Sequence, residues 1–482
     1  MRKMENSYKY LIEGTKKSPK KECLVLGGIV YTYADLFEIV AKKAFFFKEN
    51  GVSQGSKVAL YSDNYLDVIS SIFGIWSLDA TVIPMNVIQK EDKLQLIEEL
   101  VNPDIGFYSK EYEVNYLRNF ELKEIQIGDE SLKLVQTVNN LEALILFTSG
   151  SSGVPKGVPI SHEALYHNTI STARRLGLKE DDKIFINTPP YTTSSLVHVL
   201  TLMSHGGCIV MEKGFMFGAS LLGQIVKHNC TGFGGVPVHF KRIVAGYAKD
   251  LDLGRLRFLM NSGDHLPISV INSIRELFPA LKIYCAYGLT EVGGRLCILS
   301  PEDVDAKKGS VGRPLDQMEI TIRDEHGHDL GLNKLGEVYV DGKCLMDGYL
   351  NNEEVNKVEM TAFGFKTGDI GRLDEDGCLF LQGRKDDIIK VGGEKVSVKM
   401  IEDVIFSFED FKEFMVVPFQ DKHIGRVPCL YYVLNEGVDF NRGKLLKYLR
   451  QKLPQNHIPT KFVETEKIKR TASGKSIRKV QL

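Results

Sequence analysis

One short stretch, residues 147–157, constrains the fold of this chain more than any other. It reads Phe-Thr-Ser-Gly-Ser-Ser-Gly-Val-Pro-Lys-Gly, with three glycines, four hydroxyl side chains and one lysine. The apolar run Ala143–Phe147 before it is typical of a buried strand, and Ser161 beyond it suits a helix N-cap. Glycines bring backbone N–H groups close to an anion, while hydroxyls and a lysine add donors and positive charge. The stretch therefore predicts a phosphate-binding loop.

This loop is not a Walker A motif. Gly150 and Gly153 lie too close together for that pattern, and Lys156 is followed by glycine, not by serine or threonine. The difference argues against a P-loop phosphotransferase or ATPase. Taken alone, the stretch could also be a surface turn rich in serine and glycine.

Length and composition favour a globular protein of two or three domains. The chain has 482 residues, 43% of them hydrophobic and 26% charged, and its net charge of −1 favours neither nucleic acid nor an anionic membrane. No apolar run reaches the roughly 18–20 residues that cross a bilayer, and the polar start lacks a signal-peptide core. The eight scattered cysteines form no C-x-x-C pair, so we expect reduced thiols and a cytoplasmic location.

Helical and strand patterns alternate over much of the chain, as in the amphipathic segment Tyr33–Asn50 followed by the apolar run Lys57–Tyr61. Such alternation favours an α/β fold with parallel strands. We expect a large N-terminal domain of layered α/β subdomains over residues 1–385, with a β-rich subdomain at about 310–385. The remainder, residues 386–482, is expected to form a small mobile α+β domain.

Four further motifs follow the glycine loop in a fixed order. They are Tyr287-Gly-Leu-Thr-Glu291, Lys366-Thr-Gly-Asp369, Gly383-Arg-Lys-Asp386 and Arg470-Thr-Ala-Ser-Gly-Lys475. With Thr32-Tyr-Ala-Asp-Leu36, the series resembles the adenylate-forming superfamily of acyl- and aryl-CoA synthetases, nonribosomal peptide adenylation domains and firefly luciferase. The resemblance covers nearly the whole chain. It implies that a carboxylate attacks the α-phosphate of ATP, giving acyl-AMP and pyrophosphate, and that a thiol then displaces AMP.

The resemblance assigns most motif residues to ATP. Thr290 and Glu291 would face the α-phosphate, and a carboxylate there implies Mg²⁺ between Glu291 and the phosphates. Asp369 would accept hydrogen bonds from both ribose hydroxyls, with Arg384 reaching the same sugar. Tyr287 offers a flat face for adenine. The residues expected to bind ATP are Thr148, Ser149, Gly150, Ser151, Ser152, Gly153, Lys156, Ser262, Gly263, Asp264, Tyr287, Gly288, Asp369 and Arg384.

The resemblance also implies a C-terminal domain that moves. Lys475 would bridge the attacking carboxylate and the phosphate, where a fixed ammonium lowers the barrier. Asp386 would be the hinge between the two half-reactions. Gly392 and Gly393 would form the turn beside which pantetheine enters, although a plain hairpin turn is the alternative for this pair.

The expected acid pocket departs from the family pattern. Thr192 stands where amino-acid-activating members carry an aspartate and many acyl-CoA synthetases carry a histidine. An α-amino acid is therefore disfavoured, because a buried ammonium without a carboxylate is costly. Small residues in the pocket and at Val292-Gly-Gly294 would leave volume for an aryl or medium-chain acyl group. The pocket residues are expected to be Thr192, Ser195, Gly234, Gly235 and Ala286.

Three further departures concern the C-terminal domain. Val398 and Met400 replace a proline and a glutamate after the hinge, and Lys469 replaces the proline before the last motif. The first hypothesis is an acid–thiol ligase that uses ATP, Mg²⁺ and coenzyme A. The alternative is a stand-alone adenylation enzyme that loads an aryl or acyl acid onto the phosphopantetheine of a carrier-protein partner.

A catalytically inactive homologue that only binds its ligands belongs to a different class. It is disfavoured because the residues that the resemblance assigns to the reaction are retained. These are Thr290, Glu291, Asp369, Arg384 and Lys475.

Overall fold

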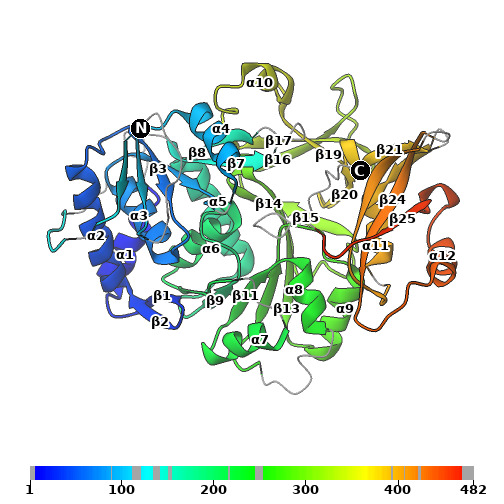
Figure 1. Ribbon diagram of the computed structural model, residues 1–482, viewed down its shortest axis with the longest axis horizontal. Helices are drawn as coiled ribbons and strands as arrows, with labels where there is room; N and C mark the ends of the chain where they lie inside the picture. The colour runs from blue at the N-terminus through cyan, green and yellow to red at the C-terminus, as the bar shows by residue number, and fades with distance from the viewer. Residues whose placement is uncertain are drawn as a thin grey trace.

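Figure 1 shows the protein as a computed structural model, with the N-terminal helices and the C-terminal sheet at opposite ends of an elongated molecule. The layers of helices and sheets confirm the predicted α/β fold. The structure describes residues 6–87, 89–110, 121–126, 128–133, 142–149, 155–214, 218–244, 253–391, 394–406, 408–421 and 425–468.

A six-stranded sheet lies in the N-terminal part, with the order β6-β5-β3-β4-β7-β8. Along its strand β3, Val58 and Leu60 pack against α2 and α3, while Ala59 and Tyr61 pack against α4 on the other face. This is the two-residue alternation of a strand covered by helices on both sides. The elements are α2 (Tyr33–Glu49), β3 (Lys57–Tyr61), α3 (Tyr65–Ser77), β4 (Thr81–Met85), α4 (Glu91–Val101), β5 (Ile105–Tyr108), β6 (Glu121–Glu124), β7 (Glu142–Ser149) and β8 (Pro155–Ser161).

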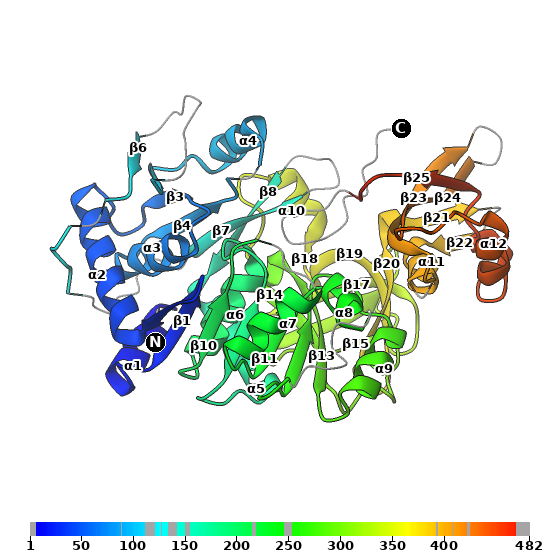
Figure 2. The same ribbon diagram turned by 60° about the horizontal axis from the view of Figure 1, so that its bottom comes forward.

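A second, fourteen-stranded sheet runs through the middle of the molecule (Figure 2). Its strands β1, β10, β9, β11, β12 and β13 are parallel neighbours. The core around Ile184 includes side chains of α5 and α6, and the core around Phe185 includes those of α7, α8 and α9. The elements are α1 (Lys9–Lys17), β1 (Glu22–Leu26), β2 (Ile29–Thr32), α5 (His162–Leu176), β9 (Lys183–Ile186), α6 (Thr193–Met203), β10 (Cys208–Met211), α7 (Gly218–Lys227), β11 (Gly232–Gly235), α8 (Pro237–Arg242), β12 (Phe258–Asn261), α9 (Ile268–Leu277) and β13 (Lys282–Leu289).

The strands expected in a separate β-rich subdomain continue this same sheet. Strand β14 is antiparallel to β13, and β15 joins β14 to β20. The chain therefore passes from parallel to antiparallel pairing without a break between sheets. These elements are η2 (Thr290–Val292), β14 (Gly294–Leu299), β15 (Ser310–Pro314), β16 (Met318–Arg323), β17 (Gly336–Gly342), α10 (Glu353–Glu359), β18 (Met360–Thr361), β19 (Gly364–Leu373) and β20 (Leu379–Arg384).

The C-terminal segment has a hydrophobic core of its own, which includes Val398, Leu430 and Leu449. It joins the rest of the chain through the short helix η3 (Lys385–Asp387). Its strands β23 and β24 form an antiparallel hairpin. The elements are β21 (Ile388–Val391), β22 (Glu394–Ser397), α11 (Val398–Ile405), β23 (Phe411–Asp421), β24 (Gly425–Leu434), α12 (Arg442–Arg450), η4 (Gln455–His457) and β25 (Lys461–Glu464).

The glycine loop differs from the predicted strand–loop–helix order, because strand β8 lies between the loop and α5. Strands β7 and β8 form an antiparallel hairpin in which Thr148 is paired with Lys156. Val158 and Ile160 of β8 are buried, but prolines and a glycine in Pro155–Ser161 hide this alternation in the sequence. The N-cap prediction is confirmed, since the Ser161 hydroxyl accepts a 3.0 Å hydrogen bond from the backbone of Ala164.

All eight cysteines are free thiols, and all but the half-buried Cys285 are buried. Within the described ranges, we find no helix with both the length and the apolar character that crossing a membrane would need.

Candidate active site

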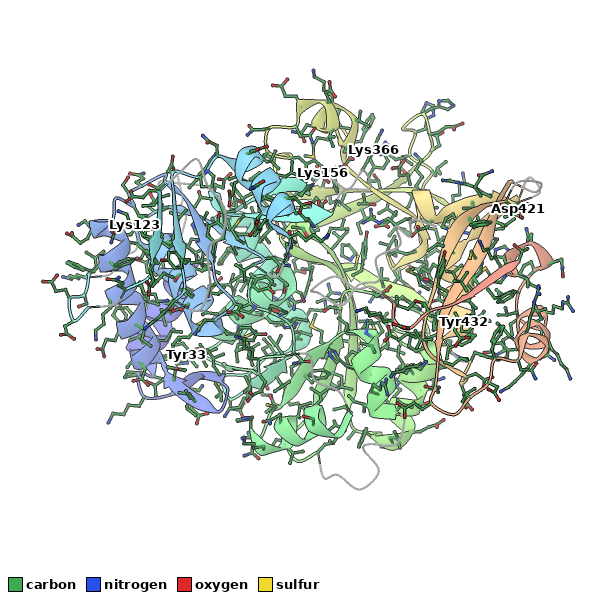
Figure 3. All side chains as sticks on the ribbon, viewed as in Figure 1. Tyr33, Lys123, Lys156, Lys366, Asp421 and Tyr432 are labelled. Carbon is green, nitrogen blue, oxygen red and sulfur yellow. The ribbon has the colours of Figure 1, made fainter. Side chains whose placement is uncertain are left out.

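The base of the glycine loop is tied to a distant turn through Lys156. Its ammonium lies 2.7 Å from Oε1 of Glu359 at the end of α10, and 4.4 Å from the centre of the Tyr349 ring. Figure 3 labels Lys156 close to α4 and α10. The backbone N–H of Leu350 also donates to the carbonyl of Gly157 at 2.9 Å. The lysine predicted to contact phosphate is therefore held by an acid and an aromatic ring.

Glu291 lies in η2, directly after β13, and only 9% of its surface is exposed. The Tyr349 hydroxyl donates to its carboxylate at 2.8 Å. Burial, and then the charge of Glu291, raise the pKa of Tyr349 well above its usual range, so this tyrosine stays a donor. A short series of contacts, from Lys156 through Tyr349 to Glu291, thus connects the glycine loop to η2.

Tyr349 and Glu359 are the site residues that sequence reasoning missed. Each contacts its partner across a long sequence separation, so no local pattern marks it. The available signal was weak: Tyr349 is an isolated aromatic residue in the polar stretch 347–352.

The Glu291 carboxylate could bind a Mg²⁺ ion that the phosphates of a nucleotide also bind. Magnesium is usually bound through one or two carboxylates, with phosphates and water completing its octahedron. In the part of the chain that the structure describes, no cluster of three His, Cys, Asp or Glu side chains could hold a metal by itself. Glu291 would thus supply one ligand, and phosphate oxygens would supply others.

Asp369 stands where three of the sequence motifs meet. It lies on β19 opposite Arg384 on β20, and 6% of its surface is exposed. Its carboxylate accepts a hydrogen bond from the Tyr287 hydroxyl and lies 3.2 Å from Nε of Arg384. Burial, together with the Asp369 charge, raises the pKa of Tyr287 well above its usual range, which keeps the phenol protonated as the donor.

Ser262, Gly263 and Asp264, which are expected to bind ATP, form a turn that is fixed in part by backbone contacts. Ser262 donates from its N–H to the carbonyl of Gly235 at 2.9 Å, and Gly263 has φ +89°, in the left-handed region that glycine tolerates best. The Asp264 carboxylate accepts from the N–H of His265 at 2.8 Å. One oxygen of the Asp264 carboxylate is thus used inside its own turn, and the residue stays exposed.

Thr192 and Ser195 lie at the start of α6, where their hydroxyl groups form hydrogen bonds with nearby residues of the chain. Thr192 is the N-cap: it accepts from the N–H of Ser195 at 3.4 Å and donates to the carbonyl of Pro189 at 2.9 Å. The Ser195 hydroxyl is fully buried and donates to the carbonyl of Thr188 at 3.0 Å. Ala286 is buried on β13.

The expectation that small residues leave open volume is wrong for Gly234 and Gly235 of β11. A Cβ on Gly234 would lie 2.9 Å from Nε2 of His198, and one on Gly235 would lie 2.6 Å from the Phe233 ring. Neighbouring rings therefore occupy the space that the missing side chains leave. The same holds at Gly294, where a Cβ would lie 2.8 Å from a methyl group of Val197.

Several predicted residues lie outside the part of the chain that the structure describes. Asp386 is described for its backbone alone, within η3, and Ser149 likewise ends strand β7. Of the departures in the C-terminal domain, Val398 is buried in its core and Met400 is exposed on α11. The residues outside the described ranges are Gly150, Ser151, Ser152, Gly153, Gly392, Gly393, Lys469 and Lys475.

Comparison with known proteins identifies the family. The model of the AMP-binding enzyme family matches residues 12–350, and that of its C-terminal domain matches residues 400–475. The chain is 27% identical over 476 residues to a 2-succinylbenzoate–CoA ligase of Bacillus subtilis, covering 97% of this chain and 96% of that protein. It is 26% identical over 470 residues to the ligase of the same name from Geobacillus kaustophilus, covering 96% and 94%.

Solved structures agree with this result. The o-succinylbenzoate CoA synthetase of Bacillus subtilis, in complex with its acyl-adenylate, superimposes with a TM-score of 0.88 at 25% identity, covering 99% of this chain and 98% of that one. The same enzyme with ATP and magnesium gives 0.86 at 25% identity, covering 98% of both chains. The chain thus belongs to the AMP-binding enzyme family of adenylate-forming enzymes, and it is an AMP-forming ligase of the acyl- and aryl-CoA synthetase type.

Proposed function

We propose that the acid is an aromatic dicarboxylate of the 2-succinylbenzoate type, and that the thiol acceptor is free coenzyme A. The observation that carries this proposal is the near full-length similarity to ligases of that name, which spans 97% of this chain. Free coenzyme A is favoured over a carrier protein because these relatives are coenzyme A ligases. The names of these relatives support this choice between the two acceptors that the sequence left open.

For the nucleotide, we propose the roles that the motifs predict. Asp369 would hold the ribose diol, and its carboxylate is already oriented by Tyr287 and Arg384, so the sugar would meet a preorganised acceptor. Glu291 would hold Mg²⁺, whose chemistry is to neutralise charge on the phosphates. Lys156 would exchange Glu359 for a phosphate oxygen, since both partners are anionic oxygens.

For the C-terminal segment, we propose a domain that covers residues 386–482 and turns about Asp386. A core separate from that of the large sheets supports this division. The structure resembles the Bacillus subtilis relative with its acyl-adenylate at a TM-score of 0.88, and a double mutant of that relative with a product analogue at 0.71. That difference supports the proposal that the domains can be arranged in more than one way.

The first prediction concerns the products. With ATP, Mg²⁺ and 2-succinylbenzoate, we expect pyrophosphate and acyl-AMP, and with coenzyme A a thioester and AMP. Chromatography of the nucleotides distinguishes AMP, acyl-AMP and ADP. It is carried out over a panel of carboxylic acids, with and without coenzyme A. Acid-dependent ADP would contradict the adenylation reaction, whereas AMP formed only with another acid would contradict the substrate alone.

A second prediction tests the contact between Tyr349 and Glu291. The Tyr349→Phe variant should raise the Mg²⁺ and ATP concentrations needed for half-maximal rate by about tenfold, because a hydrogen bond to a charged group is lost from a buried carboxylate. Mg²⁺ titration of pyrophosphate release measures the shift. The matched control is Tyr431→Phe, which removes a buried hydroxyl without a hydrogen-bond partner among the described residues. Equal Mg²⁺ dependence in both variants would exclude this role for Tyr349.

A further inference from the structure

Arg295, on strand β14, carries a buried guanidinium that no described residue pairs. Only 4% of its surface is exposed, and none of its three side-chain nitrogens finds a hydrogen-bond partner among the described residues. Its backbone, in contrast, is fixed, because Asn168 donates to the Arg295 carbonyl at 2.7 Å. An unpaired charge at this depth destabilises a fold, and such a group calls for a reason.

Other arginines around the central sheet do have partners. Arg175 donates to the carbonyl groups of Ile298 and Pro314, at 3.4 and 3.1 Å. Arg257 donates from Nε to Asp182 at 2.9 Å. Arg295 therefore differs from these arginines, whose side chains do have hydrogen-bond partners.

His198, on α6, is a second buried group, and it lies near enough to feel the charge of Arg295. It is 2% exposed, and its Nδ1 has no hydrogen-bond partner within the described ranges. Burial, and then the positive charge of Arg295, lower the pKa of His198 well below its usual range, so the imidazole is neutral. Burial lowers the pKa of Arg295 to about 9, so the guanidinium stays charged at neutral pH. Together they offer one positive charge and one neutral N–H donor.

The chemistry of these donors selects a carboxylate. A guanidinium presents parallel N–H donors in a plane, which match the two oxygens of a carboxylate. A bound carboxylate would both neutralise the buried charge and satisfy nitrogens that lack partners. An uncharged ligand could satisfy the nitrogens but could not neutralise the charge.

The position of the pair indicates where that carboxylate comes from. Arg295 is paired across strands with Gly288, inside the motif that ends at Glu291. His198 lies on α6, the helix that Thr192 caps and that also carries Ser195. Its ring packs against Gly234 of β11. Figures 1 and 2 both show α6 beside β11 and β14. These are the elements from which the sequence predicts the acid pocket.

We propose that Arg295, with His198 beside it, binds the carboxylate of the acid substrate that does not react, and thereby selects dicarboxylic acids. This inference rests on the proposed function and adds the residues that recognise its substrate. A monocarboxylic acid that reacts at its only carboxylate leaves Arg295 unpaired. Sites built around a buried polar group reject analogues that lack its partner by about 10⁴-fold or more.

The test compares three acids in the intact enzyme: 2-succinylbenzoate, 4-oxo-4-phenylbutanoate without the ring carboxylate, and 2-butanoylbenzoate without the chain carboxylate. For the wild type, we expect kcat/KM for the dicarboxylate to exceed that for the better monoacid by about 10⁴-fold or more. Arg295→Met should reduce this ratio to about tenfold or less, mainly because the KM for the dicarboxylate rises. Arg295→Lys should fall between the two, because it keeps the charge but not the planar donors.

The matched control is Arg175→Met, which removes a structural arginine on α5 and should leave the ratio of the acids unchanged. Thermal unfolding gives an independent measurement. Without ligand, Arg295→Met should unfold at a higher temperature than the wild type, because an unpaired buried charge is gone. Added 2-succinylbenzoate should raise the melting temperature of the wild type but not that of Arg295→Met.

The outcomes separate this inference from the proposed function. If 2-succinylbenzoate is the best acid and Arg295→Met keeps the wild-type ratio, the role of Arg295 is refuted while the proposed function stands. If another dicarboxylate is the best acid and loses its advantage in Arg295→Met, the role stands and the proposed acid is wrong. If the best acid carries one carboxylate, or if Arg295→Met only lowers the melting temperature, the inference is overturned.

Discussion

Replacing Lys475 by alanine is expected to lower the rate of acyl-AMP formation by about 100- to 1000-fold, as loss of a preorganised charge at a reacting centre does. Negative charge moves from the attacking carboxylate to the leaving pyrophosphate, and an ammonium between them stabilises that transfer. Acid-dependent pyrophosphate release measures the rate. Thioester formation from supplied acyl-AMP should be much less affected, because Lys475 would serve only the first half-reaction.

The structure limits how Lys475 can reach the site. Ile468 is the last described residue, and it packs against Met415 and Tyr431 in the C-terminal sheet. The stretch 469–475 can span at most about 25 Å when fully extended. Lys475 can therefore act only where the C-terminal domain lies close to the nucleotide. Lys479→Ala, in the same basic tail, is the control, and equal losses in both half-reactions of Lys475→Ala would contradict this division of roles.

The sequence marks candidate residues for the nucleotide more clearly than candidate residues for the acid, for a physical reason. ATP requires particular groups, such as a carboxylate for a diol and donors for phosphates, so its motifs are short and recognisable. The structure brings Tyr287, Asp369 and Arg384 together, although their roles toward ATP stay predictions. Tyr349 could not be found in this way, because its contact with Glu291 depends on the fold and not on a local pattern.

Small residues were ambiguous in the sequence. A glycine can leave a cavity open, or it can admit a neighbouring ring, and only the tertiary structure decides between them. At Gly234 and Gly235 the rings of His198 and Phe233 take the space. Arg295 carried a usable signal, since it is a lone charge within the otherwise apolar strand Gly294–Leu299. A charge in a buried strand indicates either a structural partner or a ligand.

Replacing Asp386 by proline is expected to allow acyl-AMP formation and to lower the rate of thioester formation by about 100-fold or more. A reactive group that is misplaced by about 1 Å costs about that much in rate. Asp386 is the middle residue of η3, between β20 and β21. Proline fixes φ near −65° and is tolerated in the first turn of a helix. It should therefore preserve the described arrangement while preventing a rotation about this residue.

Asp386→Ala is the matched control, because it removes the same carboxylate but leaves the backbone free to turn. If the backbone rotation matters, the alanine variant should form thioester much faster than the proline variant, at a similar melting temperature. Rapid mixing with coenzyme A, after acyl-AMP has accumulated, measures the second step alone. Equal thioester rates in the two variants, or a parallel loss of stability and both rates in the proline variant, would remove Asp386 from the mechanism.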